Sequence, residues 1–449
     1  MLEIPLQKGA GTPLYRQIAD HLKTMIDRGA LTGGYRLPGT RELAQALSVS
    51  RTTTSEAYAL LAAQGYIVEK GRSGSFVAIR PPRISCGPDG GGDHHLDLAS
   101  ERPSPGMLPR KAVTGLLRSL ESLKEGEFFA PSPLVGHEGL REALIHHGVL
   151  RGIPVQGDHL VVTGGGIEGL STALAALRAL GTTKLWVEEL TFPDIIPMAQ
   201  AEGLNVASLP LGEEALVDRA RSIGPGEALY LIPSFHNPTG RTLTFQARQE
   251  LLRLGERQSF WIIEDDTYGE FRYGSASVPA LKSLDGAERV LYIGSFSQLL
   301  FPGLRIGYGL LPPSMKDPFL AVRGRRFGPL STLTQKAALA FIVRGGLDEG
   351  LRRLRSLLKG RMDRLASALA RAFPQFSVVP PQGGIYLWLD TTPRDGEALA
   401  SAARAAGVAL AAGRLFAWPP RPVAGLRFSV SRLDGLALTV AVRHLKEVW

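Results

Sequence analysis

The sequence predicts an α/β protein of two parts, in which a small helical unit with a β-hairpin precedes a large unit built on a mostly parallel sheet flanked by helices. Helical patterns and one pair of β-rich runs fill residues 1–80. Residues 81–97 have no apolar period and are interpreted as a linker, whereas β-rich runs alternate with helical patterns over residues 98–449. At 449 residues the chain is too long for one ordinary core, so two or more domains are expected.

The composition indicates a globular protein of a reducing compartment. Hydrophobic residues make up 44% of the chain and charged residues 21%, as in soluble domains. A single cysteine, Cys86, excludes an intrachain disulfide. The sequence has no run of about 18 uncharged apolar residues, and its first residues lack a basic segment followed by an apolar one. We therefore expect a cytoplasmic chain with no membrane partner.

The first unit contains three helical patterns. The first ends at Gly29 and has an apolar stripe made of Leu14, Ile18, Leu22, Met25 and Ile26. Thr40 and Ser50 are suited to cap the next two helices, because their side-chain oxygens accept hydrogen bonds from free backbone N–H groups. Two short helices joined by a tight turn predict a helix-turn-helix.

A basic hairpin follows these helices. Two β-rich runs surround residues 70–74, which read KGRSG and place positive charge at the hairpin tip, as in a wing. Residues 1–80 hold ten Lys and Arg against six Asp and Glu, which favours a polyanion partner. The third helix begins with Arg51, Thr52 and Thr53, whose donors suit phosphates and base edges when a helix end enters a major groove. Taken singly, these residues also fit helix caps and a solvated surface charge.

The segments PLYRQIADHLKTMI, YRLPGTRELAQALSVSRTTTSEAYALL and GRSGSFVA resemble the winged helix-turn-helix domain of GntR-type bacterial repressors. The resemblance covers residues 10–80, and Gly39 stands where that family usually has a serine. The DNA-contacting residues that it implies, the last two of them in the wing, are Arg41, Arg51, Thr52, Thr53, Gly71 and Arg72.

In the large unit, polar and glycine residues follow directly after the predicted strands, where ligands of α/β sheets bind. Asp265 and Tyr268 follow the run FWII, and a carboxylate there can hold a protonated ring nitrogen. The run GGGIEGL at 164–170 opens a helix whose backbone N–H groups can hold a phosphate. Arg427 can clasp a carboxylate through two N–H groups. Singly, these features also fit a solvated strand end and a flexible connection.

Together and in this order, the motifs resemble those of fold-type I aminotransferases of the aspartate aminotransferase class. The likeness runs over residues 98–449 and includes GLREAL at 139–144, FHNPTG and PQGGIYLWLD. It implies a smaller C-terminal α+β subdomain beside the large sheet. An aminotransferase-like domain behind a GntR winged helix is the architecture of the MocR (GabR-like) subfamily of transcription regulators.

The resemblance implies a site for pyridoxal phosphate. Asp265 would pair with the pyridine nitrogen and Arg427 would bind the carboxylate of an effector, while Asn237 and Tyr268 would contact the ring hydroxyl. The residues implied around the phosphate are Gly165, Gly166, Ser295, Ser297 and Arg305. No metal is expected, because the adjacent His94 and His95 lack a third and fourth ligand.

Gln298 stands in the motif SFSQ, where the family has SFSK and the lysine forms an imine with the cofactor. An amide cannot form this imine, because its nitrogen lone pair is delocalised into the carbonyl, and it is not basic enough to carry the proton. We therefore expect no catalytic residue and no aminotransferase turnover. One sequence does not distinguish a natural glutamine from an engineered replacement of lysine.

Binding without catalysis stays open. The ring, phosphate and carboxylate contacts can hold pyridoxal phosphate noncovalently, with Gln298 donating a hydrogen bond. Against this, Ile167 and Glu168 replace uncharged polar residues that are common after the phosphate loop, and a carboxylate repels a phosphate unless it points away. The alternative is a different small-molecule effector that carries a carboxylate or a phosphate.

The predicted function is that of a cytoplasmic transcription regulator whose aminotransferase-like domain senses a small ligand. The family forms head-to-tail homodimers, so that two winged helices meet two half-sites of an operator. Three alternatives stay open: an active pyridoxal enzyme with an incidental DNA-binding domain, a ligand-free architectural dimer that binds DNA, and nucleic-acid binding without a specific operator. The sequence does not identify the effector, the operator or the sign of regulation.

Overall fold

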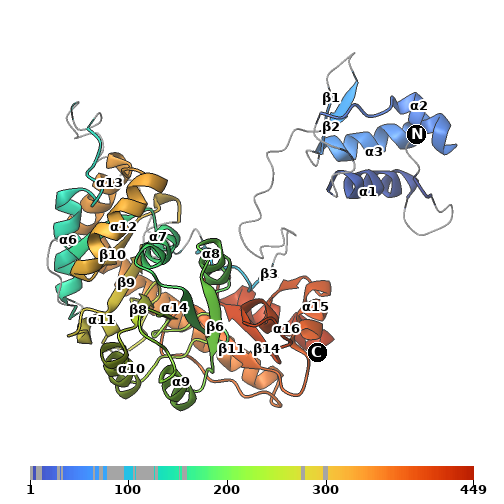
Figure 1. The fold of residues 1–449 in the computed structure, drawn as a ribbon. Coiled ribbons are helices and arrows are strands. Elements are labelled where there is room, and N and C mark those ends of the chain that lie inside the picture. Colours follow the sequence, from blue (N-terminus) through green and yellow to red (C-terminus); the bar gives the residue numbers. More distant parts are fainter. Residues whose placement is uncertain are drawn as a thin grey trace. The chain divides into compact units, whose positions relative to one another are not determined.

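The computed structural model divides the chain into two compact units, Met1–Pro88 and Asp89–Trp449 (Figure 1). The structure describes residues 4–6, 13–27, 31, 34–63, 66–69, 74–77, 96–104, 107, 126, 130–150, 152–153, 159–274, 279–296 and 302–449. The division falls inside the predicted linker, residues 81–97, most of which lies outside the described ranges. The exact bounds of the linker therefore stay a prediction.

The first unit combines three helices with a short antiparallel hairpin. The apolar stripe predicted on its first helix turns inward, since Ile18 and Leu22 are buried together with Ala57 and Leu61 of the third helix. The predicted helix-turn-helix with a wing is confirmed. Its elements are α1 (Leu14–Asp27), α2 (Thr40–Leu47), α3 (Arg51–Ala63), β1 (Ile67–Glu69) and β2 (Ser75–Val77).

The two predicted helix caps have different outcomes. Ser50 Oγ accepts a hydrogen bond from the backbone N–H of Thr53 at 3.1 Å, which confirms the cap of α3. Thr40 does not cap α2; it is the first helical residue, and Gly39 holds the cap position. The helix starts one residue earlier than predicted because Glu42 reaches back and accepts the N–H of Gly39 at 3.3 Å.

The second unit contains a seven-stranded sheet in the order β4-β10-β9-β8-β7-β5-β6. Strand β10 runs antiparallel to both of its neighbours, and the other pairs are parallel, which confirms the predicted mostly parallel sheet. The strands are β4 (Leu160–Thr163), β5 (Lys184–Glu188), β6 (Asn205–Leu209), β7 (Ala228–Leu231), β8 (Trp261–Asp265), β9 (Val290–Ser295) and β10 (Gly307–Leu310).

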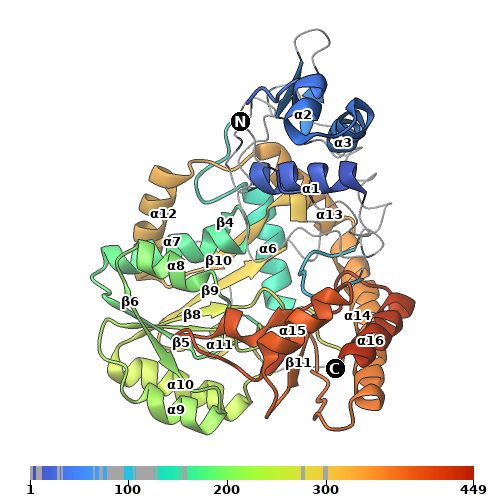
Figure 2. The ribbon, with the colours of Figure 1, turned by 90° about the vertical axis from the view of Figure 1, so that its right-hand side faces the viewer.

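Helices cover both faces of this sheet, as Figure 2 shows for α7 and α8 on one side and α9 and α10 on the other. Along β5, Leu185 and Val187 belong to the core beneath α7, and Trp186 belongs to the core beneath α10. This double burial explains the unbroken apolar runs of the strands. The helices are α6 (Glu138–Leu150), α7 (Gly166–Ala179), α8 (Ile195–Ala201), α9 (Glu213–Ala220), α10 (Phe245–Gln258), α11 (Leu281–Leu284), α12 (Pro313–Arg326) and α13 (Thr332–Val343).

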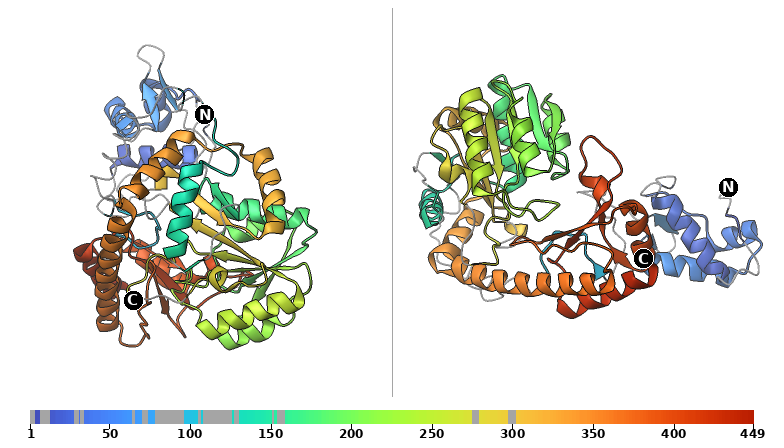
Figure 3. Two further views of the ribbon diagram at one scale, coloured as in Figure 1. Left: turned by 90° about the vertical axis from the view of Figure 1, so that its left-hand side faces the viewer. Right: turned by 90° about the horizontal axis from the view of Figure 1, so that it is seen from below.

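The chain ends in a smaller α+β subdomain, as predicted. Helix α14 (Gly346–Ala372), 27 residues long, packs against α16 and is the long orange helix in the right-hand view of Figure 3. A three-stranded antiparallel sheet has the order β11-β14-β13. The other elements of this subdomain are β11 (Tyr386–Asp390), α15 (Gly396–Ala405), β12 (Val408–Ala409), β13 (Ala411–Ala412), the 3₁₀ turn η5 (Gly413–Phe416), β14 (Gly425–Ser429) and α16 (Gly435–Val448). A second 3₁₀ turn, η4 (Pro302–Leu304), precedes β10 of the large sheet.

The last two positions of the predicted linker belong to this subdomain. They form β3 (Leu96–Asp97), which pairs in parallel with β12. Among the helices that the structure describes, none has the length and apolar character to cross a bilayer. Within the same residues, no group of three or more His, Cys, Asp and Glu side chains is arranged to hold a metal ion.

Candidate ligand-binding site and DNA-binding surface

Three predicted site residues meet at one edge of the large sheet. Asp265 is the last residue of β8, Ser295 is the last residue of β9, and Asn237 lies in the loop that follows β7. These strands are parallel neighbours, so their carboxyl ends lie side by side. The three side chains are also buried, with exposed fractions of 2–8%. The sheet therefore brings the three side chains together at the carboxyl ends of its strands.

The carboxylate of Asp265 is held by neighbours on both oxygens. Tyr230 Oη donates to Oδ2 at 2.8 Å, and Thr267 donates to Oδ1 from its hydroxyl at 2.6 Å and from its backbone N–H at 3.1 Å. Burial raises the pKa of Asp265, and these hydrogen bonds oppose that rise. A carboxylate oxygen has more than one lone pair, so Asp265 retains capacity to accept a bond from a ligand.

The predicted phosphate loop lies next to this carboxylate. Gly165 precedes α7 with a φ of 104°, a left-handed conformation that suits glycine, and Gly166 begins the helix. A Cβ atom placed on Gly166 would lie 3.5 Å from both Ser295 Cβ and Thr267 Oγ1. The free N–H groups of α7 thus open beside Ser295 and Thr267, which is a suitable arrangement for an anion.

The structure does not show the other three predicted phosphate and cofactor residues at this carboxylate. Arg305 is exposed and has a left-handed φ of 52°, two residues before β10. Ser297 and Gln298 lie outside the described residues, so their predicted roles are untested.

Glu168, which would repel a phosphate unless it points away, is paired with an arginine. Glu168 Oε1 accepts from Arg323 Nε at 2.9 Å, and the Arg323 side chain is fully buried. Arg323 Nη1 also donates to the carbonyl oxygen of Leu134 at 2.6 Å. The Glu168 charge is therefore balanced by a guanidinium, while Ile167 beside it is 40% exposed.

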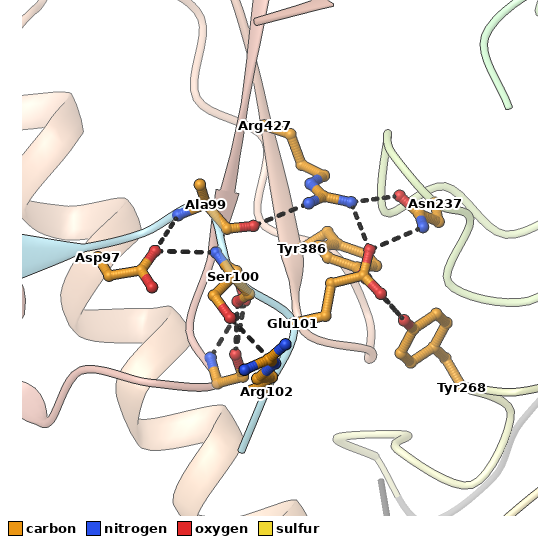
Figure 4. A network of polar contacts seen from close by, with 11 residues as sticks. Asp97, Ala99, Ser100, Glu101, Arg102, Asn237, Tyr268, Tyr386 and Arg427 are labelled. Atoms are coloured by element: carbon orange, nitrogen blue, oxygen red, sulfur yellow. Dashed lines mark hydrogen bonds and ion pairs between the residues drawn. The ribbon is translucent and has the colours of Figure 1, made fainter. Parts of the chain in front are cut away.

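Arg427 lies at the centre of a polar network near this edge (Figure 4). Its Nη1 donates to Asn237 Oδ1 and to Glu101 Oε1, both at 2.8 Å, and its Nη2 donates to the carbonyl oxygen of Ala99 at 2.8 Å. The guanidinium also lies 4.4 Å from the ring centre of Tyr386 and 4.6 Å from that of Phe416. Two aromatic faces and three oxygen acceptors thus fix its plane.

Glu101 is a member of this site that the sequence analysis missed. Besides Arg427, it accepts hydrogen bonds from Asn237 Nδ2 at 3.2 Å and from Tyr268 Oη at 3.3 Å. Tyr268 and Tyr386 share a further bond of 2.6 Å between their hydroxyls, and burial raises the pKa of both well above the usual value. Both phenols therefore stay protonated near neutral pH. No local signal marks Glu101, because 326 positions separate it from Arg427.

In the first unit, the predicted DNA-contacting residues of α2 and α3 lie on the surface. Arg41, Arg51 and Thr52 are exposed, and Thr53 is half-buried with its hydroxyl 2.8 Å from Ser50 Oγ. The predicted wing residues Gly71 and Arg72 lie outside the described residues.

Two buried hydroxyls of α3 bond this helix to the first residue of α2 and to the segment that precedes α2. Thr54 Oγ1 donates to the carbonyl oxygens of Thr40 and Arg51, at 2.8 and 2.9 Å, and Tyr58 Oη donates to that of Pro38 at 2.8 Å. The N-terminus of α3 is thereby held in a defined orientation to α2, as a helix that enters a groove requires.

Comparison with known proteins assigns both units. Residues 103–445 match the family of aminotransferases of class I and II, and residues 14–77 match the bacterial regulatory proteins of the gntR family. The chain belongs to the aminotransferase class I and II family and carries a GntR-type helix-turn-helix domain. The predicted combination of these two domains is confirmed.

Individual relatives are similar to this chain over most of its length. The chain is 29% identical to the probable rhizopine catabolism regulatory protein MocR of Rhizobium meliloti, over 79% of this chain and 77% of that protein. It is 28% identical to the pyridoxine biosynthesis transcriptional regulator PdxR of Corynebacterium glutamicum, over 86% and 85%.

A solved structure matches the second unit. LysN, an α-aminoadipate aminotransferase of Thermus thermophilus complexed with N-(5′-phosphopyridoxyl)-L-leucine, superimposes with a TM-score of 0.69 at 26% identity. The match covers 79% of this chain and 91% of that chain. The relatives named above are transcription regulators, whereas this structural neighbour is an enzyme.

Proposed function

We propose that this protein is a MocR-like transcription regulator whose aminotransferase-like domain binds a small ligand noncovalently and does not turn it over. One observation carries the proposal: the contact groups of the site are assembled around Asp265 and Arg427, yet the lysine position of the SFSK motif holds Gln298. A regulator needs only the contact groups, whereas an aminotransferase needs the lysine as well.

The residues present fit pyridoxal phosphate. Asp265 would hold the ring nitrogen, and Gly165, Gly166 and Ser295 would hold the phosphate at the start of α7. Arg427, whose buried Nε has no hydrogen-bond partner in the described part of the chain, would bind a carboxylate of the ligand. When bound, such a group supplies a ring that withdraws electrons from an attached amino acid.

The chain's own residues would bind and orient this ligand without moving a proton. Asn237 and Tyr268 would contact the ring hydroxyl, with Ser297 and Arg305 at the phosphate. Gln298 lacks a basic amine, so it can neither form the covalent link nor shuttle a proton between carbons. General acid–base catalysis alone contributes about 10²–10⁴-fold to a rate, so its loss leaves no useful turnover.

The GntR-type domain would bind an operator. The groups proposed to contact it are Arg41, Arg51, Thr52 and Thr53, with Gly71 and Arg72 in the wing. A head-to-tail homodimer would present two such domains to two half-sites, and the ligand would shift the equilibrium between two arrangements of them. The size of that shift is limited by the difference in ligand affinity between the two arrangements.

The proposal is tested by separating binding from turnover. Calorimetry with pyridoxamine phosphate should show binding to the wild-type chain, and assays of amino-group transfer with pyridoxal phosphate present should show none. The matched variant Gln298→Lys should gain an absorbance band with pyridoxal phosphate that borohydride fixes to the protein. Multiple turnovers by the wild-type chain would contradict the proposal, and so would the absence of binding to both chains.

A further inference from the structure

The guanidinium of Arg427 is covered by a short segment of the same chain. Glu101 takes one hydrogen bond from Nη1, and the carbonyl oxygen of Ala99 takes one from Nη2. Both terminal nitrogens, which form the fork that grips a carboxylate, thus face residues 99–101. Figure 4 shows the Glu101 carboxylate lying between Arg427, Asn237 and Tyr268.

Glu101 supplies the charge balance that this arginine needs. Arg427 is only 4% exposed, and a buried cation without a partner is strongly destabilising. Asn237 and Ala99 contribute neutral oxygens, so the carboxylate of Glu101 is the negative charge in direct contact with the guanidinium. Its position is the one that a carboxylate of a bound ligand would need.

Two carboxylates cannot share this position. Glu101 already uses Arg427, the Asn237 amide and the Tyr268 hydroxyl, and a second carboxylate at the same donors would meet like-charge repulsion. The Glu101 side chain is 32% exposed, so it can turn toward solvent. Asp97 Oδ1 accepts the N–H groups of Ala99 and Ser100, which anchors the backbone while that side chain moves.

We propose that Glu101 is an internal carboxylate that occupies the recognition site of Arg427 and that any carboxylate-bearing ligand must displace. This inference rests on the proposed function, because it assumes that Arg427 faces a ligand. It makes Glu101 a specificity residue: ligands without a carboxylate leave it seated, and ligands with one compete against it. When Glu101 contacts Arg427 in about nine molecules out of ten, a ligand carboxylate binds about tenfold more weakly. The reason is that the apparent dissociation constant scales inversely with the fraction of molecules in which Arg427 is free.

The test uses two probes that differ by one carboxylate. N-(5′-phosphopyridoxyl)-L-alanine and N-(5′-phosphopyridoxyl)ethylamine carry the same ring, phosphate and methyl group. Calorimetry on the full chain gives the ratio of their dissociation constants. Glu101→Gln keeps the shape of the side chain and removes its charge. It should tighten the alanine adduct about tenfold, equivalent to about 1.4 kcal/mol, and leave the ethylamine adduct within about twofold.

Two further variants keep the result interpretable. Glu101→Ala removes the competing oxygens altogether and should change the ratio in the same direction, even if Glu101→Gln folds poorly. Asp194→Asn is the matched control, because Asp194 lies close enough to Glu101 for their charges to interact and makes no capping bond on α8. It should change the affinity of both adducts by the same factor, as a general reduction of negative charge would.

The outcomes separate this inference from the proposed function. If the adducts bind and the ratio is the same in wild type and both Glu101 variants, Glu101 does not compete and the inference is wrong while the proposed function stands. A weaker alanine adduct in Glu101→Gln would overturn it equally, since Glu101 would then assist binding. If neither adduct binds to any chain, the proposed function fails and this inference fails with it.

Discussion

The two halves of the candidate site differ in how the chain completes them. In the ring and phosphate half, Asp265 and Ser295 end the neighbouring strands β8 and β9, and Gly166 begins α7 three residues after the end of β4. In the carboxylate half, Arg427 is satisfied by Glu101, a side chain from the opposite end of the same unit. The first half is built from local motifs, and the second depends on a contact between distant segments.

Under the two proposals, this difference means that a binding site can keep its contact groups and still change which ligands it accepts. In the ring half, Tyr230 and Thr267 hold the Asp265 carboxylate by hydrogen bonds, and neither would compete with a ligand for it. In the carboxylate half, Glu101 is proposed to occupy the position of a ligand carboxylate. The expected effects of substitutions therefore separate into those that act on both adducts equally and those that act on the carboxylate alone.

The largest effect is expected for Arg427→Ala, which breaks the carboxylate half. It leaves Glu101 without its cation and removes the guanidinium from between Tyr386 and Phe416. The free energy of unfolding should fall by about 3 kcal/mol, at the low end for a broken buried pair because Glu101 can reach solvent. Urea unfolding measures the loss, and a stable variant would show that the network contributes little.

The same variant should also lose discrimination between the alanine and ethylamine adducts. Calorimetry should give equal dissociation constants for the two, since neither finds the guanidinium. A retained preference for the alanine adduct would assign carboxylate recognition to another residue.

A smaller effect is expected for Asp265→Asn, which breaks the ring half. Replacing the carboxylate removes a charge-assisted bond to the ring nitrogen, so both adducts should bind more weakly, by about 1.5–3 kcal/mol. The ratio between them should stay at the wild-type value. A change in that ratio would mean that the two halves are coupled.

The third prediction concerns Arg51→Ala, which touches neither half. Operator binding should weaken by about 1–3 kcal/mol if Arg51 reads a base edge, and both adducts should bind as to wild type. Fluorescence anisotropy with duplexes selected from a random pool measures the DNA affinity. An unchanged affinity would mean that Arg51 does not contact the DNA. A substitution of Glu56, which is exposed on the same helix, serves as the control.

The smallest effect is a pH dependence of stability from Asp265. Burial raises its pKa in the folded chain above the unfolded value of about 3.9, so the folded state holds the proton to higher pH. Stability should therefore fall as pH rises from about 3.9 through the raised value, and stay level above it. Urea unfolding over this range should show a shallower fall in Asp265→Asn. An identical slope would mean that Asp265 ionises normally in the fold.

Sequence patterns predicted most of the fold because they are local. The apolar stripe from Leu14 to Ile26 and the β-rich runs of the large unit correspond to α1 and to the strands of the sheet. The cap of α2 was misplaced at Thr40, because the side chain that replaces a cap, Glu42, lies inside the helix. Element boundaries depend on such short contacts, and composition alone does not reveal them.

The site was predicted unevenly for the same reason. Asp265, Asn237 and Ser295 are recognisable because polar residues at strand ends converge in a parallel sheet. The neutralisation of Glu168 by Arg323 was not predictable, since α7 and α12 meet only in the folded chain. Glu101 was missed because an acidic residue in a Pro- and Ser-containing stretch has many ordinary explanations.

The sequence by itself determined the order of the elements, the polar residues at the strand ends and the amide at position 298, since each is a property of neighbouring residues or of one side chain's chemistry. Only the tertiary structure decided which atoms face Arg427. That choice depends on β3 pairing with β12 and β14 pairing with β11, which together bring residues 99–101 to a guanidinium 326 positions away from Glu101. Contacts of that range are set by the packing of whole elements, and no local pattern encodes them.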